Sequence, residues 1–227
     1  MKRRILFILM LFLSLQSFAQ NNGSFISLRS GISIPVGNYK SHNLDKGSFT
    51  LPGINMSADG AWFITTHFGI GGQAGFEMHS VDASALATAK VKADPFLSDL
   101  TIRSDPFRIF HAALGVYSNW NLGKKFSANA KLLAGMMWVN TAYQLYKPTY
   151  FGAGPDYFEI TSSKDNKFFL EPGIGIQYKL SSSLALKAET ELISRKMTFG
   201  FATWQGMRYD IKQISYVNTV LALVILL

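Results

Sequence analysis

Residues 126–138 read FSANAKLLAGMMW, and the alternation within this stretch decides the fold class. Every even-numbered position from Phe126 to Trp138 is apolar, whereas the odd-numbered positions are Ser, Asn, Lys and Gly apart from Leu133 and Met137. A period of two residues indicates a β-strand with one apolar face. At about 3.3 Å per residue and a tilt of about 45°, the segment between the two aromatic residues spans roughly 28 Å, close to the hydrocarbon thickness of a bilayer. The stretch therefore predicts a membrane-spanning β-strand with an aromatic side chain at each boundary.

The first twenty residues have the composition of an export signal. Residues 2–4 are basic, residues 5–15 form an apolar segment interrupted only by Ser14, and residues 17–20 offer small side chains for cleavage. The apolar segment is shorter than the roughly 20 residues that a membrane helix needs, although a short N-terminal anchor helix is the alternative. We expect a signal peptide at residues 1–20 and a single domain at residues 21–227.

The composition excludes several classes of site. The chain has no cysteine, so it forms no disulfide and no zinc–thiolate site, and export without cysteine fits a bacterial envelope protein. The formal charge is +8, but three of the cations lie in the predicted signal peptide and the others are scattered along the chain. A nucleic-acid partner requires basic residues concentrated on one face, so we expect none.

The alternation of apolar and polar residues recurs along the whole chain. The last of the alternating segments is apolar on both faces in its second half, so its register is open. The predicted strands are residues 24–35, 51–63, 68–79, 107–120, 126–138, 167–180, 184–195 and about 210–226.

The connections between these segments alternate strictly between short and long. Short periplasmic turns and longer extracellular loops are typical of outer-membrane barrels. A backbone in lipid must pair all its polar groups internally, so a membrane protein without helical spans has to be a closed barrel. We therefore predict an all-β, eight-stranded antiparallel up-and-down transmembrane barrel; the rival is a soluble lipocalin-like barrel, which would turn its apolar face inward. The short connections are residues 64–67, 121–125 and 181–183, and the long ones are about residues 36–50, 80–106, 141–166 and 196–209.

The chain resembles the eight-stranded outer-membrane β-barrel family, the OmpA-like or OmpX-like barrels, most closely the porin-like versions common in Bacteroidetes. The resemblance rests on the end of the signal segment, residues 17–20, and on the strand FLEPGIGIQY at residues 169–178. It implies a location in the bacterial outer membrane, contact with outer-membrane lipid, and no cofactor. Pro172 departs from a regular central strand because it lacks an N–H, so we expect a bulge or a local break there.

The predicted inward faces collect charged residues of both signs. Eight strands enclose an interior just wide enough to be filled by side chains. An ion-paired interior with a structural role is therefore the expectation, and catalysis or proton conduction is the alternative. The predicted lumenal charges are Arg29, Asp59, Glu77, Lys131, Glu171, Lys179, Lys187, Glu189 and Glu191.

An enzymatic site has little support in the sequence. Some small barrels modify lipids, and this chemistry needs a nucleophile with a nearby base. Only His79-Ser80, at the rim of a strand, suggests such a pair, and a histidine with ordinary hydrogen bonds is the simpler interpretation. The glycine run at residues 69–75 has no following helix pattern and no Lys-Ser or Lys-Thr pair, so it is no phosphate loop. We expect no catalytic, metal or cofactor site.

The long loops carry the remaining functional signal, because aromatic side chains are favoured at recognition surfaces. The prediction is a non-enzymatic barrel with a structural or surface-interaction role, of which an accessory role in a secretion machine is one variant; a lipid A acylase or deacylase is the alternative. The alternative for the loop aromatics is that the strands continue beyond the bilayer and these rings pack on one another. The residues predicted to contact a protein or glycan partner are Tyr146, Tyr150, Phe151, Tyr157 and Trp204.

Overall fold

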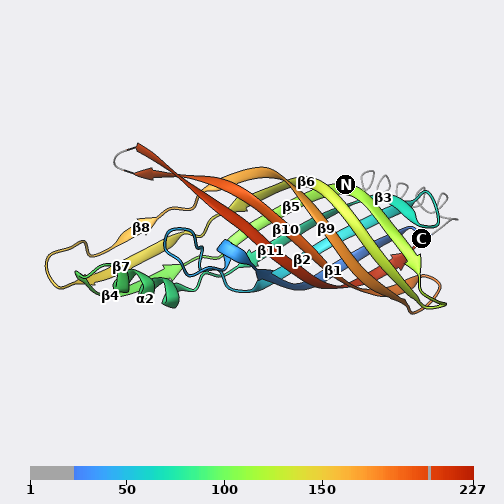
Figure 1. Cartoon of the computed structure of the whole chain (residues 1–227), viewed down its shortest axis with the longest axis horizontal. Coiled ribbons are helices and arrows are strands. Elements are labelled where there is room, and N and C mark those ends of the chain that lie inside the picture. The colour runs from blue at the N-terminus through green and yellow to red at the C-terminus, as the bar shows by residue number, and fades with distance from the viewer. Residues whose placement is uncertain (1–22, 204–205) are drawn as a thin grey trace, which may run out of the picture.

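The computed structural model describes residues 23–203 and 206–227, so the predicted signal peptide and Trp204 lie outside the described residues. Eight strands close into a barrel in which each strand pairs antiparallel with its neighbours, as predicted (Figure 1). Each predicted strand is present, and the main difference is that β10 is longer. In barrel order the strands are β1 (Phe25–Pro35), β11 (Gly206–Leu226), β10 (Leu184–Thr203), β9 (Lys164–Lys179), β6 (Phe126–Asn140), β5 (Phe107–Asn121), β3 (Phe68–His79) and β2 (Gly53–Phe63).

The register of the last strand is fixed by its pairing with the first. β1 and β11 pair continuously from Phe25↔Leu226 to Pro35↔Tyr216, which closes the barrel. In this register Val220 and Val224 are buried inside, whereas Leu221 is 73% exposed on the outer face.

The outer face of the barrel is apolar and exposed. Aromatic rings on neighbouring strands lie beside each other near both ends of this face: Phe126 with Tyr178 at the end with short turns, their centroids 4.9 Å apart, and Phe110 with Trp138 at the other, 5.5 Å apart. Ile174, between these levels, is 69% exposed. Such a surface is stable in lipid, and it excludes the lipocalin-like alternative because the apolar face points outward. Among the described residues, no helix is long and apolar enough to cross a membrane.

The barrel wall is interrupted beside Pro172. On one side of β9, the pairing with β6 includes Leu132↔Pro172 and continues beyond it. On the other side, the pairing with β10 ends at Gly173↔Glu191 and does not include Pro172. The predicted break is therefore found on one side of the strand, where the missing proline N–H faces β10. Beyond this point the backbone N–H of Thr198 donates to a side-chain oxygen of Asp165 at 2.7 Å.

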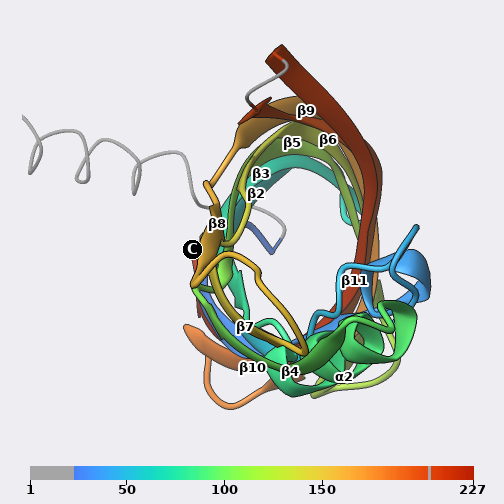
Figure 2. The same ribbon diagram turned by 90° about the vertical axis from the view of Figure 1, so that its left-hand side faces the viewer.

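The predicted long loops at residues 80–106 and 141–166 fold into a cap with its own helix and strands (Figures 1 and 2). A second sheet joins β4 to β7 and β7 to β8, and the helix α2 packs against β4. The helix begins after Asp82, whose carboxylate accepts a hydrogen bond from the N–H of Ala85 at 2.9 Å, a standard N-cap. The cap elements are α2 (Ala83–Ala93), β4 (Leu97–Ser104), β7 (Gln144–Tyr150) and β8 (Phe158–Ile160), and the first loop contains the short helix η1 (Gly37–Tyr39).

The fourth long connection is a continuation of β10 and β11. Their pairing runs up to Thr203↔Gly206, well beyond the last pairs that join them to β1 and β9. Residues 194–203 and 206–215 therefore form a two-stranded arm beside the cap. Phe199 on this arm is buried.

Candidate functional site

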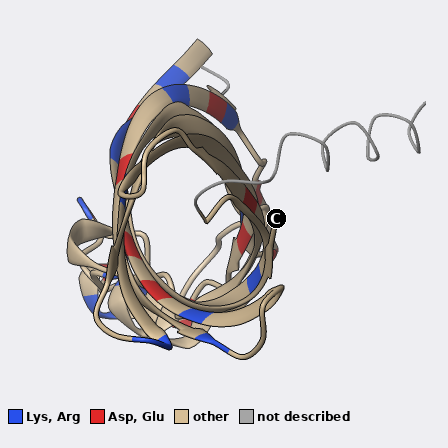
Figure 3. Cartoon of the chain, turned by 90° about the vertical axis from the view of Figure 1, so that its right-hand side faces the viewer, with Lys and Arg blue, Asp and Glu red and all other residues tan. Residues whose placement is uncertain are grey.

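The barrel lumen contains a buried network of ion pairs contributed by several strands. Figure 3 shows acidic and basic residues at several positions along the ribbon of the barrel wall. Lys131 lies with its Nζ 2.5 Å from Glu189 Oε1 and 2.5 Å from Glu191 Oε1. Arg29 pairs with Glu191 as well, and it donates to Gln73 Oε1 at 2.5 Å. β1, β3, β6 and β10 are thus linked across the interior by side chains that have no access to solvent.

A second part of the network extends toward the end with short turns. Lys187 Nζ lies 3.1 Å from Asp59 Oδ2 and 2.9 Å from Glu189 Oε2. Ser27 donates a hydrogen bond to Asp59, and Lys187 lies over the ring of Phe25, 4.7 Å from its centroid. Each of these charges is buried together with a partner, as a low-dielectric interior requires.

A third part surrounds Glu77 and His111 toward the extracellular end. His111 Nδ1 lies 3.2 Å from Glu77 Oε2, and Asn55 and Asn218 donate to Glu77 Oε1 at 2.7 and 3.1 Å. Gln73 donates from Nε2 to Glu171 Oε1 at 2.8 Å. The carboxylates are therefore held by neutral amides as well as by cations.

The structure buries eight of the nine predicted lumenal charges in this network. Lys179 is the exception: it is exposed at the end of β9 and lines a hollow at the barrel mouth beside Lys125. The predicted lumenal set contained charged residues alone, so it did not include the neutral members of the network. The same alternation places these members on the inward faces: Asn55, Gln73, His111 and Asn218.

Glycines on the inward face make room for this network. A Cβ on Gly75 would lie 2.4 Å from Cε1 of His111, and one on Gly173 would lie 2.9 Å from Cε of Lys131. Side chains of neighbouring strands thus occupy the space above each glycine, as expected for a barrel filled by side chains.

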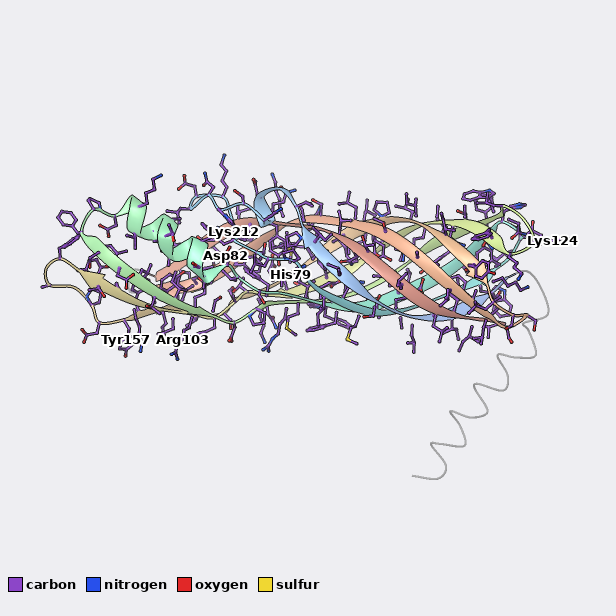
Figure 4. All side chains as sticks on the ribbon, turned by 90° about the horizontal axis from the view of Figure 1, so that it is seen from below. His79, Asp82, Arg103, Lys124, Tyr157 and Lys212 are labelled. Atoms are coloured by element: carbon purple, nitrogen blue, oxygen red, sulfur yellow. The ribbon has the colours of Figure 1, made fainter. Side chains whose placement is uncertain are left out.

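A layer of aromatic rings closes the lumen at its extracellular end. The ring of Tyr39 lies 5.3 Å from that of His79 and 5.7 Å from that of Phe107, and Tyr216 lies 5.3 Å from His79 on the other side. All four side chains are buried. Figure 4 places His79 where the cap meets the barrel.

The arrangement of His79 bears on the predicted rim pair. Its Nε2 lies 2.8 Å from Oγ of Ser33, and its Nδ1 lies 3.3 Å from the hydroxyl of Tyr39. The neighbouring Ser80 is exposed, and both imidazole nitrogens contact other residues. Ser33 is buried, so a substrate has no route to the one serine that His79 contacts.

A groove of about 540 Å³ lies above this aromatic layer, between α2, β7, the first loop and the arm. Its apolar lining includes Phe49, Leu86, Tyr146 and Phe201, and its cations are Lys90, Arg208 and Lys212. This volume is within the range of small-molecule sites.

The cations of the groove differ in how they are paired. Arg208 pairs with Asp210 at 2.9 Å, and Lys212 donates to the carbonyl oxygen of Gly47 at 3.1 Å. Lys90 is half-buried with its Nζ 5.3 Å from the centroid of Tyr146, and no carboxylate of the described residues lies within 4.0 Å of it. Burial and the positive charge of Arg208 lower the pKa of Lys90.

The predicted recognition residues fall into different environments. Tyr146 is buried and stacks on Phe158, with centroids 4.6 Å apart, so its ring supports the cap and lines the groove. Tyr150 is half-buried, whereas Phe151 and Tyr157 are 78% and 63% exposed. Trp204 lies outside the described residues.

An exposed residue that the sequence analysis did not select, Phe96, adjoins Phe151. The backbone N–H of Phe151 donates to the carbonyl oxygen of Phe96 at 3.0 Å, and Phe96 is 73% exposed. Tyr157, just before β8, is a further exposed aromatic residue of the cap, set back from this pair because Phe158 lies opposite Tyr146. We refer to Phe96, Phe151 and Tyr157, the exposed aromatic side chains of the cap, as the aromatic tip. Figure 4 shows Tyr157 in the cap, far from Lys124 at the opposite end of the molecule.

Within the described residues, no group of three or more His, Asp or Glu side chains is arranged to hold a metal ion.

Comparisons with known proteins agree with this architecture. A family model described as "Outer membrane protein beta-barrel domain" matches residues 5–217. Neisserial surface protein A has a similar structure, with a TM-score of 0.55 at 7% identity over 91% of this chain and 98% of that chain. No curated protein matches the chain.

Two further solved structures are similar at lower scores. OprG from Pseudomonas aeruginosa has a TM-score of 0.48 at 11% identity over 89% of this chain and 96% of its own. Ail from Yersinia pestis has a TM-score of 0.43 at 15% identity over 90% of this chain and 98% of its own.

Proposed function

The chain belongs to the outer membrane protein beta-barrel family and sits in the lipid of the bacterial outer membrane, and from this premise we propose that it is a non-enzymatic, non-conducting barrel that binds partners at the cell surface. The barrel would serve as the membrane anchor, and the folded cap would carry the contact surface.

The observation that carries this proposal is the aromatic tip on a folded cap. Phe96, Phe151 and Tyr157 are each more than 60% exposed, although the cap beneath them has its own buried residues. Phe96 and Phe151 adjoin each other, and Tyr157 adds a third exposed ring on the same hairpin. Exposed apolar side chains that lie together mark interaction sites, and Phe and Tyr are enriched in recognition surfaces. A rigid cap loses little conformational entropy on binding, which favours affinity.

The closed lumen supports the non-conducting part of the proposal. Ion pairs fill the interior, and the rings of Tyr39, His79, Phe107 and Tyr216 cover it. Sieve-like channels are found in barrels of about 16 strands, twice the number here. Reconstitution in planar bilayers should give no stepwise conductance.

The lipid-modifying alternative has no accessible nucleophile at the two buried histidines. The serine in contact with His79 is buried, and the groups that His111 contacts among the described residues, Glu77, Gln73 and Glu171, carry no hydroxyl. Mass spectrometry of lipid A from cells with and without the gene distinguishes the two functions. We expect identical profiles; a change in acylation would overturn the proposal.

The surface role is tested by co-purification from native membranes in mild detergent after brief crosslinking. The test variant carries Phe96→Ser, Phe151→Ser and Tyr157→Ser, and the matched control carries Ile64→Ser and Leu122→Ser, two exposed residues in turns at the opposite end. We expect a partner that the wild type and control retain and the tip variant loses. Identical profiles for all three proteins would rule out the tip as the contact surface.

A role as accessory subunit of a secretion machine is one form of this proposal. In that case the retained partner would be a subunit of an export complex, whereas a free-standing barrel would retain a surface glycan or a protein of another cell.

A further inference from the structure

We infer that the groove between α2 and the β10–β11 arm binds a small organic anion with a planar apolar body. The site is separate from the aromatic tip, and the inference does not depend on partner binding there.

One wall of the groove carries two positively charged side chains. Lys90 projects from α2 and Arg208 from β11, and both line the same hollow. Arg208 has Asp210 as a partner, but Lys90 has no carboxylate of the described residues within 4.0 Å. A half-buried ammonium without a counter-ion is unfavourable, and a bound anion would remove this cost. α2 and β11 thus bring the cations Lys90 and Arg208 close to each other. Burial and the positive charge of Arg208 lower the pKa of Lys90.

Apolar surface lies beside these cations. Tyr146 forms one wall below Lys90, and Phe201 forms the other, with the guanidinium of Arg208 5.7 Å from its ring centroid. Phe107 lies at the bottom, where the aromatic layer closes the lumen. The two faces of Tyr146 are occupied by Phe158 and Lys90, so this ring holds Lys90 at the groove. Phe201 offers an aromatic ring beside the cations, which favours a planar ligand body because aromatic groups stack in offset or edge-to-face arrangements.

The groove does not continue into the lumen of the barrel. The rings of Tyr39, His79 and Tyr216 lie beneath it and are buried. A molecule that enters from outside therefore stays at the mouth, so the geometry favours binding over passage. A volume of about 540 Å³ accommodates a molecule with one or two fused rings.

The cations and the rings together define the ligand. Its carboxylate, sulfonate or phosphate would lie between Lys90 and Arg208, where charge-assisted hydrogen bonds are strong. Its planar body would lie against Phe201 and the other apolar side chains that line the groove.

The experiment uses the full barrel in bilayers of zwitterionic lipid and three probes. Naphthalene-2-sulfonate has both features, naphthalene-2-sulfonamide has the ring without the charge, and methanesulfonate has the charge without the ring. Isothermal titration calorimetry measures the affinity, and amide chemical shifts of α2 and β11 locate the site. We expect only the first probe to bind at a single site with shifts in both elements.

Substitutions on α2 provide the matched controls. Lys90→Gln should weaken binding of naphthalene-2-sulfonate about tenfold or more, the loss expected for one hydrogen bond to a charged group. Lys90→Arg should retain most of the affinity. Lys92→Gln changes an exposed lysine two residues away, which lines the shallow surface between α2 and β4, and should leave the affinity unchanged.

Three results would overturn the inference: equal binding of the neutral sulfonamide, equal binding of methanesulfonate, or an affinity unchanged by Lys90→Gln. Failure of naphthalene-2-sulfonate to bind would overturn it as well. The spectra of β5 and β6 report whether each variant still forms the barrel, so a loss of binding through misfolding is recognised directly.

Discussion

Lys131 on β6 places its Nζ 2.5 Å from Oε1 of Glu191 on β10, although β9 lies between the two strands in the barrel wall. Gly173 of β9 pairs with both residues, and the two side chains meet above it, so the contact links strands that share no backbone hydrogen bonds. Removing one partner of a buried ion pair leaves the other charge without that compensation. The resulting loss of stability is larger than the net stabilisation that the intact pair provides.

We predict that Lys131→Met lowers the free energy of unfolding by about 3–5 kcal/mol, because Glu189 and Glu191 would lose one of the two cations that they share, Arg29 being the other. Urea unfolding in lipid vesicles, followed by tryptophan fluorescence, measures the change. Lys179→Met is the control: this lysine is exposed, so its replacement should change stability by less than about 0.5 kcal/mol. Equal effects of the two substitutions would show that the lumenal network does not stabilise the barrel.

The inward glycines lead to a second prediction. Gly75→Val should destabilise the barrel by about 1–3 kcal/mol, because its Cβ would lie 2.4 Å from the ring of His111 and the packed lumen offers no space for a shift. Gly123→Val in a short turn has no atom within 4 Å of the added Cβ and serves as the control. The same urea titration compares them, and a stable Gly75→Val barrel would indicate a loosely packed interior.

Sequence alternation predicts which face a residue occupies but not its depth. Lys131 and Lys179 both belong to the inward face of their strands, yet only Lys131 lies deep enough to be enclosed. Alternation, connection lengths and the absence of helical spans were sufficient to predict the eight barrel strands. In lipid, a chain without membrane helices can pair all its backbone polar groups only in a closed barrel.

The cap could not be predicted in the same way. Arg103 of β4 pairs with Leu145 of β7, and the barrel strands β5 and β6 lie between them in the sequence, so no local pattern relates the two segments. The helix did leave a signal: Asp82 precedes an alanine-rich segment and caps it. The seventh strand was predicted to end at Arg195, with strands that continue beyond the bilayer as the alternative; the pairing in fact continues to Thr203.

Pro172 gives a third prediction. Pro172→Thr restores an N–H on the side of β9 that faces β10, so the ladder should extend beyond Gly173↔Glu191 toward Leu192. Hydrogen exchange of the amides at residues 192–194 should slow about fivefold, the factor for about 1 kcal/mol per added hydrogen bond. Exchange at Leu132 on β6 should stay the same, because that ladder is already continuous. Unchanged exchange on β10 would mean that another feature separates the strands.

Tyr146 gives a prediction about alkaline pH. Burial raises the pKa of its hydroxyl from 10.0 to about 12. The neutral form is therefore favoured in the folded cap: its contribution to stability is complete below pH 10 and is lost as the pH rises toward 12. Near-UV circular dichroism on heating should show the cap of the wild type weakening over this range relative to Tyr146→Phe, whereas Tyr157→Phe, which removes an exposed hydroxyl, should follow the wild type. Parallel pH profiles for all three proteins would contradict this assignment.

The membrane boundary is tested by two isoleucines of equal exposure. Ile174 on β9 is 69% exposed between the two levels of aromatic residues, and Ile211 on the arm is 70% exposed beyond them. In water, replacing either side chain by arginine would have a similar effect on the free energy of unfolding. A difference between the two effects therefore shows that one side chain faces lipid. We predict that Ile174→Arg lowers the free energy of unfolding in vesicles by about 2–4 kcal/mol, the cost of a cation near the bilayer midplane, and that Ile211→Arg lowers it by less than about 1 kcal/mol. The comparison needs no assumption about packing, because neither side chain is buried against the protein. If both substitutions had the same small effect, the apolar band of the barrel would not be facing lipid; if Ile211→Arg were the more costly, the bilayer would extend along the arm.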